Sequence, residues 1–319
     1  MRGVRGVHGG GVAGGRGGGT GRAAARRAAG AAALAAVLAA LGSGCDKPAA
    51  HGGTHAERSA DPVSGEHATE RPSAATWAKW GLKPMRPAPP PPVVKPLKLP
   101  AKSARVFSNV PTKDRVVFVT IDDGQEKDPR FVEMLRDLKV PVSMFLTDQS
   151  ILNDYGYFKP IRDLGDHVQN HTLTHPQMTT LGLEGQRQQI CGDQKVLTRH
   201  YGTAPILFRP PFGSWNSLTQ QAAASCGVHG IVLWKASMQI HDMQYDDPGK
   251  KLYPGDVLLA HFRGPDALKG ESMTRMFAHM LKHIRSRGFA VARLEDYVQP
   301  PPVPADGRRV RLRPGPRGR

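Results

Sequence analysis

From residue 115 onward, short apolar runs alternate with longer amphipathic stretches. Six of these runs have the length and composition of buried β-strands. They are Val116–Thr120, Val142–Leu146, Ile206–Arg209, Gly230–Trp234, Asp256–His261 and Phe289–Arg293. The amphipathic stretches between them predict helices over Arg130–Leu138, Glu184–His200, Ser217–Ser225 and Glu271–Arg287.

This alternation predicts an α/β fold in which parallel strands are joined by right-handed helical crossovers. We expect the strands to close, or nearly close, into a distorted (β/α) barrel of about seven strands. The carboxyl ends of the strands carry the chemistry in such barrels. Polar residues at these strand ends are therefore the first candidates for a functional site.

The pattern is different upstream of residue 106. Residues 46–105 show little periodic apolar pattern and are rich in Pro, Ala, His and charged residues. The prolines between Pro87 and Pro92 predict an extended, polyproline-like spacer. We therefore expect a disordered Pro/Ala-rich linker over residues 46–105 and a folded domain over residues 106–300. Trp77 and Trp80 interrupt the linker, and we expect them to pack on the domain's own surface.

Residues 1–45 are typical of an export signal. Basic residues precede the small-residue apolar stretch Ala28–Leu41, which is too short to span a bilayer as a mature helix. The segment that follows resembles a bacterial lipoprotein processing site, in which Cys45 would carry lipid and anchor the protein to a membrane. Leu41 lies one place too early for this pattern, so ordinary signal cleavage is the alternative. We expect an exported protein, anchored or secreted.

The net charge of +17 comes mainly from the two ends of the chain. Residues 1–47 hold seven basic residues and one acidic residue, and residues 301–319 hold six Arg and one Asp. The central part is only mildly basic, and no basic stripe interleaves with aromatic residues there. We therefore expect no nucleic-acid partner. Residues 301–319 are interpreted as a basic disordered tail that an anionic wall or membrane surface could attract.

The cysteines are consistent with export. If Cys45 carries lipid, Cys191 and Cys226 remain as a pair on two predicted helices. An extracytoplasmic compartment permits a disulfide between them. Spacing alone does not fix the geometry that a bridge needs, so two separately buried thiols are the alternative.

The chemistry of the chain centres on an acidic pair and a histidine pair. Asp122 and Asp123 follow the first strand directly, and two imidazoles four residues apart, His171 and His175, would share one face of a helical turn. Two imidazoles and one carboxylate are typical of a catalytic zinc-type site with open positions for water. The second carboxylate is then a candidate general base. Alone, each pair is more typical of a turn or an exposed helical face.

Two further segments end predicted strands and complete a recognisable order. The four segments are Thr120–Gly124, His171–His175, Phe208–Gly213 and Leu259–His261. In this order they resemble the polysaccharide deacetylases of carbohydrate esterase family four, the NodB-like deacetylases. The resemblance covers residues 113–298. It implies a NodB-like barrel, a polysaccharide substrate and a divalent metal ion, with zinc as the first expectation and cobalt as the alternative.

The resemblance assigns the attack on the substrate to the first two motifs. Asp123, His171 and His175 would bind the metal, and Asp122 would be the base that removes a proton from the attacking water. Arg209 would pair with Asp122 and hold it ionised and oriented. This chemistry suits an amide, because a metal polarises the poorly electrophilic carbonyl and a carboxylate beside cations stays ionised.

The resemblance assigns protonation and substrate binding to the later motifs. His261 would be the general acid that protonates the leaving amine, a task for which imidazole is well matched near neutral pH. The backbone N–H of Phe212, where the family usually has Tyr, would donate to the oxyanion. Leu259 would line the pocket for the acetyl methyl group, and Trp234 is a second candidate for substrate binding.

The chain departs from the family pattern after the strand that ends at Trp234. The family usually has an Asp there that orients the acid His, but the corresponding place near Ser237 is not acidic. Asp242 is the nearest carboxylate, and the sequence leaves open whether it reaches His261. An imidazole without a carboxylate partner would be less basic and less fixed in its tautomer.

Two function classes follow from these motifs. The first is a metal-dependent hydrolase that removes acetyl groups from N-acetylated sugars of a cell-envelope glycan, with peptidoglycan favoured because of the expected export and anchor. The second is a catalytically weak or inactive lipoprotein that binds a cell-wall glycan and keeps the fold. Amide hydrolysis in a small cyclic metabolite is a third option, which the export signal and the long tether disfavour.

Overall fold

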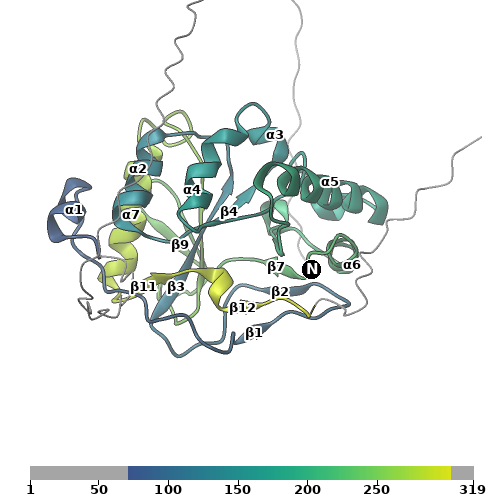
Figure 1. The fold of residues 1–319 in the computed structure, drawn as a ribbon, viewed down its shortest axis with the longest axis horizontal. Coiled ribbons are helices and arrows are strands. Elements are labelled where there is room, and N and C mark those ends of the chain that lie inside the picture. The colour runs from purple at the N-terminus through teal and green to yellow at the C-terminus, as the bar shows by residue number, and fades with distance from the viewer. Residues whose placement is uncertain (1–70, 303–319) are drawn as a thin grey trace, which may run out of the picture. The chain divides into compact units, whose positions relative to one another are not determined.

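The structure is a computed structural model that describes residues 71–302 (Figure 1). Its main element is a curled sheet of ten strands, with β11 paired to β3 beside the main order β2-β7-β6-β5-β4-β3-β10-β8-β9. The strands are β2 (Arg105–Phe107), β3 (Val116–Asp123), β4 (Ser143–Leu146), β5 (His167–Asn170), β6 (Leu207–Phe208), β7 (Gly230–Val232), β8 (Ala236–Met238), β9 (Met243–Tyr245), β10 (Val257–His261) and β11 (Ala290–Ala292).

The sheet is parallel except for the β8–β9 hairpin, and it curls back on itself. Just beyond β2, Ser108 accepts a hydrogen bond from the backbone N–H of Val257, and Val110 donates one to Gly255. These bonds link the first strand of the order to the start of β10. The predicted α/β fold with a nearly closed barrel is confirmed.

Strand β3 lies at the centre of this sheet and pairs with β4, β10 and β11. All eight of its residues are buried, which is the burial expected of a parallel strand covered on both faces. The continuous apolar run before Asp122 therefore becomes the core of the barrel. The strand delivers Asp122 and Asp123 at its carboxyl end, where they are the last two residues.

The four predicted helices are present, and shorter ones join them. They are α1 (Ala74–Lys79), α2 (Pro129–Leu138), α3 (Asp148–Ile151), α4 (Lys159–Asp163), α5 (Leu183–Tyr201), α6 (Ser217–Ser225) and α7 (Met273–Ser286). Helix α2 begins where the Asp128 side chain accepts from the Arg130 N–H, and it ends at Lys139 in a left-handed conformation. The apolar pattern does not predict β5, because Val168 is the only aliphatic residue among its four.

The predicted boundary at residue 106 is wrong for the residues that the structure describes. Within the supposed linker, α1 begins at the cap residue Ser73 and buries Trp77 and Trp80, which are 6% and 7% exposed. The Trp80 indole donates to Asp137 of α2 at 2.9 Å. The two tryptophans pack on the domain, as predicted, and they bury enough apolar area to hold this segment against it. The Pro-rich composition around them favours a linker.

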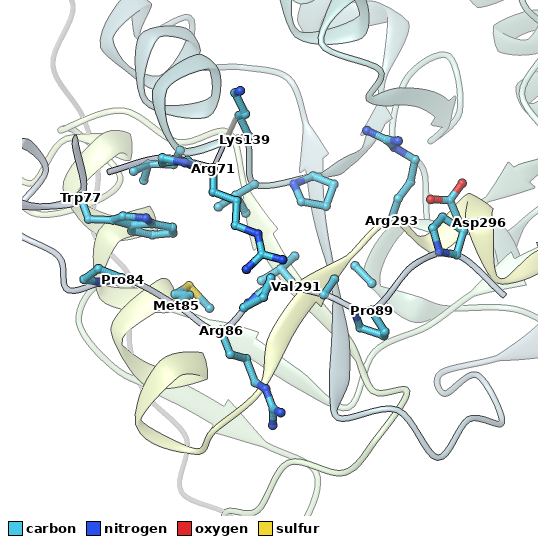
Figure 2. A pocket seen from close by; sticks show the side chains of 18 of the residues that line it. Arg71, Trp77, Pro84, Met85, Arg86, Pro89, Lys139, Val291, Arg293 and Asp296 are labelled. Carbon is cyan, nitrogen blue, oxygen red and sulfur yellow. The ribbon is translucent and has the colours of Figure 1, made fainter. Parts of the chain in front are cut away.

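Downstream of α1, the chain continues along the domain and forms one strand of a short two-stranded sheet. It also lines a cleft. Strand β1 (Leu97–Lys98) pairs with β12 (Val298–Gln299). A cleft of about 490 Å³ lies between the proline-rich segment and the barrel, with Trp77, Met85 and Val291 among its lining residues (Figure 2). It lies beside the amino-terminal end of β4, which Val140 and Pro141 precede. The described part of the linker thus covers the base of the barrel.

Cys191 and Cys226 form a disulfide that joins α5 to the end of α6, with 4.9 Å between their Cα atoms. This settles the alternative that the sequence leaves open in favour of the bridge. The expected signal segment with Cys45, residues 46–70 of the linker, and residues 303–319 of the tail lie outside the described residues. Among residues 71–302, no helix combines the length and the apolar composition needed to cross a membrane.

Candidate active site

The candidate site lies at the carboxyl ends of neighbouring parallel strands. Asp122 of β3 is in register with His261 of β10, His171 follows β5, and Arg209 follows β6. Because these strand ends meet at one edge of the curled sheet, the four motifs come together there although they are far apart in sequence. Burial is nearly complete for Asp122, His171 and Arg209.

Three side chains at this edge form a compact set of metal-ligand type. Each of Asp123, His171 and His175 offers one donor atom, and these atoms lie within 4.8 Å of one another. The Nε2 atoms of His171 and His175 are 3.5 and 3.4 Å from Asp123 Oδ1. Among the described residues this is the one group with such spacing.

The orientation of His171 suits a metal ligand. Its Nδ1 lies 2.7 Å from the carbonyl oxygen of Arg209, so Nδ1 carries a hydrogen and Nε2 is the nitrogen that would bind a metal once it has lost its own proton. Metal-binding histidines generally use their second nitrogen in this way. The donor set and its outer contact therefore fit a divalent cation.

The two histidines do not share a helical turn, and that prediction is wrong. They lie in a loop in which Thr172 and His175 have left-handed φ values of 76° and 57°. The loop is held by local bonds: Asn170 Oδ1 accepts from the Thr172 N–H, and Thr172 Oγ1 accepts from the His175 N–H. These side-chain bonds replace the helical backbone bonds and turn both imidazoles toward Asp123.

The charges in the site depend on one another. Burial raises the pKa of the Asp123 carboxyl, but the hydrogen bond and charge of His171 outweigh it and hold the pKa at about 2. Burial lowers the pKa of His171, but the charges of Asp122 and Asp123 outweigh it and raise the pKa overall. Burial and the charge of His171 both lower the pKa of His175. The two carboxylates thus give the site enough negative charge to attract one positive charge.

Asp122 and Arg209 form a buried ion pair, as the sequence predicts. Arg209 Nη1 lies 2.6 Å from Asp122 Oδ1 and 2.8 Å from Thr120 Oγ1, while its Nε donates to the Val232 carbonyl. The guanidinium lies over the Phe145 ring, 4.4 Å from its centroid. Arg209 is therefore fixed on several sides. It holds Asp122 beside the metal-type set, where Asp122 Oδ2 is 3.7 Å from His171 Nε2.

His261 lies at the same edge but without such support. Within residues 71–302 its imidazole has no hydrogen-bond partner, and burial lowers its pKa, although the charges of Asp122 and Asp123 oppose this. Asp242 does not approach it: that carboxylate is 92% exposed and lies 4.0 Å from His283 instead. Ser237, in register with Leu259 on β10, accepts from Gln239. The missing carboxylate is therefore not replaced from nearby.

The Phe212 loop forms the rim of the site. Phe212 has a left-handed φ of 60°, and its N–H makes no hydrogen bond to any described residue. Its ring is 70% exposed and meets the His175 ring edge to face at 4.8 Å. Trp234 packs against Gly213 of this loop, where a Cβ would come within 3.2 Å of the indole. Leu259 is buried on β10, two residues before His261 and on the same side of the strand.

Some residues that shape the site carry no recognisable signal in the sequence. Thr120, Asn170 and Asp193 are buried polar residues that orient Arg209 or the histidine loop. Asp193 accepts a hydrogen bond from the backbone N–H of His171, and any residue type could supply that N–H. Such a contact depends on tertiary structure, so spacing along the chain cannot reveal it.

Known proteins are similar to this chain in sequence. The family model described as polysaccharide deacetylase matches residues 109–231. A Streptomyces coelicolor protein, named as uncharacterized, is 38% identical over 60% of this chain and 77% of its own length. A peptidoglycan-N-acetylglucosamine deacetylase of Bacillus cereus is 31% identical over 35% of this chain and 41% of its own length.

A solved structure shows the fold independently. A family-four pseudoenzyme from Bacillus anthracis superposes with a TM-score of 0.51 at 21% identity, over 62% of this chain and 71% of that chain. The chain thus spans less than half of the Bacillus cereus enzyme and more than two thirds of the Streptomyces relative.

A curled, mostly parallel barrel with an Asp-His-His set at its strand ends defines a NodB-like fold. Together with these relatives, it places the chain in a known family. The protein belongs to the polysaccharide deacetylases of carbohydrate esterase family four.

Proposed function

We propose that this protein is a metal-dependent hydrolase that removes acetyl groups from N-acetylated sugars of a cell-envelope polysaccharide, peptidoglycan in the first place. One observation carries the proposal. The metal-type set of Asp123, His171 and His175 lies directly beside the buried Asp122–Arg209 pair. The peptidoglycan substrate is suggested by the name of the Bacillus cereus relative.

Asp123, His171 and His175 would hold the divalent ion, with zinc as the expected metal and cobalt as a substitute. Such an ion, when bound, acidifies water and polarises the acetyl carbonyl. The fit of the residues supports this assignment: Asp123 is ionised over the neutral range and His171 presents Nε2. The positive charge would take the place of the proton that the two carboxylates now favour on His171.

Asp122 would act as the general base. Its carboxylate faces the metal-type set with one oxygen and accepts from Arg209 with the other. The guanidinium orients this carboxylate, which must accept a proton in each turnover. Arg209 would be a positioning residue, because Asp122, Thr120 and the Val232 carbonyl already occupy its donors.

His261 and Phe212 would complete the reaction. The backbone N–H of Phe212 makes no bond to a described residue and would donate to the oxyanion that develops on the acetyl carbonyl. His261 would give a proton to the leaving amine, since an amine is a poor leaving group unless protonated. Leu259 would contact the acetyl methyl group, and Trp234 beside the rim would contact the sugar.

The proposal extends to location. An export signal over residues 1–45 and a lipidated Cys45 would keep the catalytic domain outside the cytoplasm, near its glycan. The Cys191–Cys226 disulfide supports an oxidising compartment.

A second candidate function is a catalytically weak or inactive wall-glycan-binding protein. The observation that favours it is the unsupported His261, which has no hydrogen-bond partner among the described residues and a lowered pKa. A half-buried imidazole with a lowered pKa donates a proton less often.

One assay separates the two functions. Acetate would be measured after incubation with peptidoglycan fragments and N-acetylglucosamine oligosaccharides, with chelator, with added zinc and with added cobalt. A hydrolase would release acetate. The chelator would abolish this release, and added metal would restore it. Glycan binding without acetate release under any of these conditions would sink the hydrolase and support the second function.

A further inference from the structure

Helix α5 lies directly behind the loop that carries His171 and His175. Asn170 Nδ2 donates to the Ile190 carbonyl and to Gln194 Oε1. Further along the loop, Gln189 accepts from the Thr174 N–H and donates to the Thr174 hydroxyl. The helix therefore meets both ends of the loop with hydrogen bonds.

Two successive residues of α5 contact the loop directly. At Gly192, the space that a Cβ would need is filled by the Leu173 side chain of the loop. A glycine in a helix interior lowers helix stability relative to Ala, so its presence here is explained by this contact. The next residue, Asp193, is fully buried, and its Oδ2 accepts from the His171 N–H at 3.1 Å, a donor that it shares with the Leu146 carbonyl at 3.1 Å.

Asp193 is an unusual residue for such a place. Its second oxygen, Oδ1, has no hydrogen-bond partner in the part of the chain that the structure describes. A buried carboxylate that is only partly hydrogen-bonded costs stability. Its presence is better explained by the position of the His171 backbone than by the stability of α5.

The turn of α5 that carries Asp193 is itself fixed. Cys191, two residues earlier, is bridged to Cys226 at the end of α6. Near the start of α5, Gln186 donates to Asn216, the residue that caps α6. These two contacts hold α5 against α6, which follows the Phe212 loop. Asp193, which contacts the His171 backbone, therefore lies on a helix that is fixed to its neighbour α6.

We propose that Asp193 is a positioning residue for the metal site, which fixes the backbone of His171 so that its imidazole meets Asp123 and His175. This inference rests on the metal site of the proposed function. A ligand held by an outer contact at both its ring and its backbone needs less reorganisation when it binds a metal. Asp193 touches neither substrate nor metal, so it acts through the backbone of this region, at His171 and also at Thr172 and Asp148.

The test is Asp193→Ala, which removes the acceptor of the His171 N–H, with Asp166→Ala as its matched control. Asp166 is another buried carboxylate that accepts a backbone N–H, from Val142 at 3.0 Å, and it precedes β5 at the end away from His171. Zinc dissociation constants would be measured by competition with a chromophoric chelator, and the visible spectrum of the cobalt-loaded protein would report ligand geometry.

We expect Asp193→Ala to weaken zinc binding about 10- to 100-fold, the size typical of outer contacts to metal ligands, and to alter the cobalt spectrum. Asp166→Ala should leave both unchanged, whatever its effect on unfolding. Equal zinc affinity in wild type and Asp193→Ala, or equal losses in the two variants, would overturn the inference.

A second variant covers the case in which Asp193→Ala does not fold. Gln189→Ala removes two hydrogen bonds to Thr174 from a half-buried position, and we expect zinc binding to weaken about two- to tenfold. Wild-type affinity in this variant would overturn the role of α5. A wild-type chain that binds zinc but releases no acetate would contradict only the proposed reaction, whereas one that binds no zinc would contradict both.

Discussion

The candidate site has two sides that differ in how firmly they are built. The attacking side consists of Asp122, Asp123, His171, His175 and Arg209, and its buried members each have a fixed partner. The protonating side consists of His261 at the end of β10. Its imidazole has no hydrogen-bond partner within residues 71–302, and its pKa is lowered by burial.

This difference indicates which step is at risk. In the proposed reaction, activation of the attacking water would depend on groups whose positions are fixed by neighbours. Protonation of the leaving amine would depend on one half-buried imidazole that no hydrogen bond from residues 71–302 orients. A chain of this kind can bind metal and substrate well and still turn over slowly, so metal affinity and turnover need to be measured separately.

The largest effect is expected at Asp122. Asp122→Asn keeps the size of the side chain but removes the base, so kcat should fall about 10²- to 10⁴-fold. Zinc affinity should change little, because the three ligands remain. His175→Ala is the opposite variant and should lose zinc. Near-normal turnover by Asp122→Asn, measured as acetate release, would show that another group is the base.

Next in size is the loss of the buried ion pair. Arg209→Met leaves the Asp122 charge buried without its 2.6 Å partner, and removal of one member of such a pair typically costs about 3–5 kcal/mol. Urea unfolding monitored by fluorescence would give the difference. The double variant Arg209→Met with Asp122→Asn should recover part of the loss, and no recovery would mean that Arg209 acts mainly by packing on Phe145.

A pH titration of stability tests the charge of the attacking side. The folded pKa of Asp123 is about 2, below the unfolded value of about 3.9, so the ionised carboxylate stabilises the fold above pH 4. This contribution, about 1–2.5 kcal/mol, should be lost as the pH falls from 4 toward 2. Metal-free wild type and Asp123→Asn would be unfolded in urea at several pH values. Parallel curves would contradict the assignment.

The smallest effect concerns the protonating side. Ser237 lies beside Leu259 on the neighbouring strand and faces the same side as His261, so Ser237→Asp would bring a carboxylate toward the imidazole. A carboxylate there should raise the pKa of His261 and increase kcat about tenfold. Ser237→Asn is the uncharged control. Unchanged turnover in the Asp variant would show that orientation of His261 is not limiting.

The fold and most of the attacking side can be predicted from the sequence, because short local segments determine both. The apolar runs predict most of the strands, and three of the four motifs lie at the ends of predicted strands, so parallel topology alone brings Asp122, Arg209 and His261 together. The His171–His175 motif follows β5, which the apolar pattern does not predict. The absence of a carboxylate near Ser237 is equally visible, and the structure adds that Asp242 pairs with His283.

The remaining features depend on tertiary contacts. The four-residue spacing of His171 and His175 suggests a helix, but side-chain bonds from Asn170 and Thr172 impose a loop with positive φ values. The proline-rich composition near Trp77 suggests a free linker, but burial of the aromatic rings outweighs it. Asp193 contacts a backbone N–H, for which no sequence pattern exists.

The central claim is that the Asp123, His171 and His175 set makes this chain a metal-dependent deacetylase. The most direct test is to titrate zinc into chelator-treated protein while acetate release from an N-acetylglucosamine oligosaccharide or peptidoglycan fragment is followed. The account predicts that acetate release rises with zinc and saturates at one ion per chain. Acetate release that ignores the chelator, or none at any zinc concentration, would contradict it.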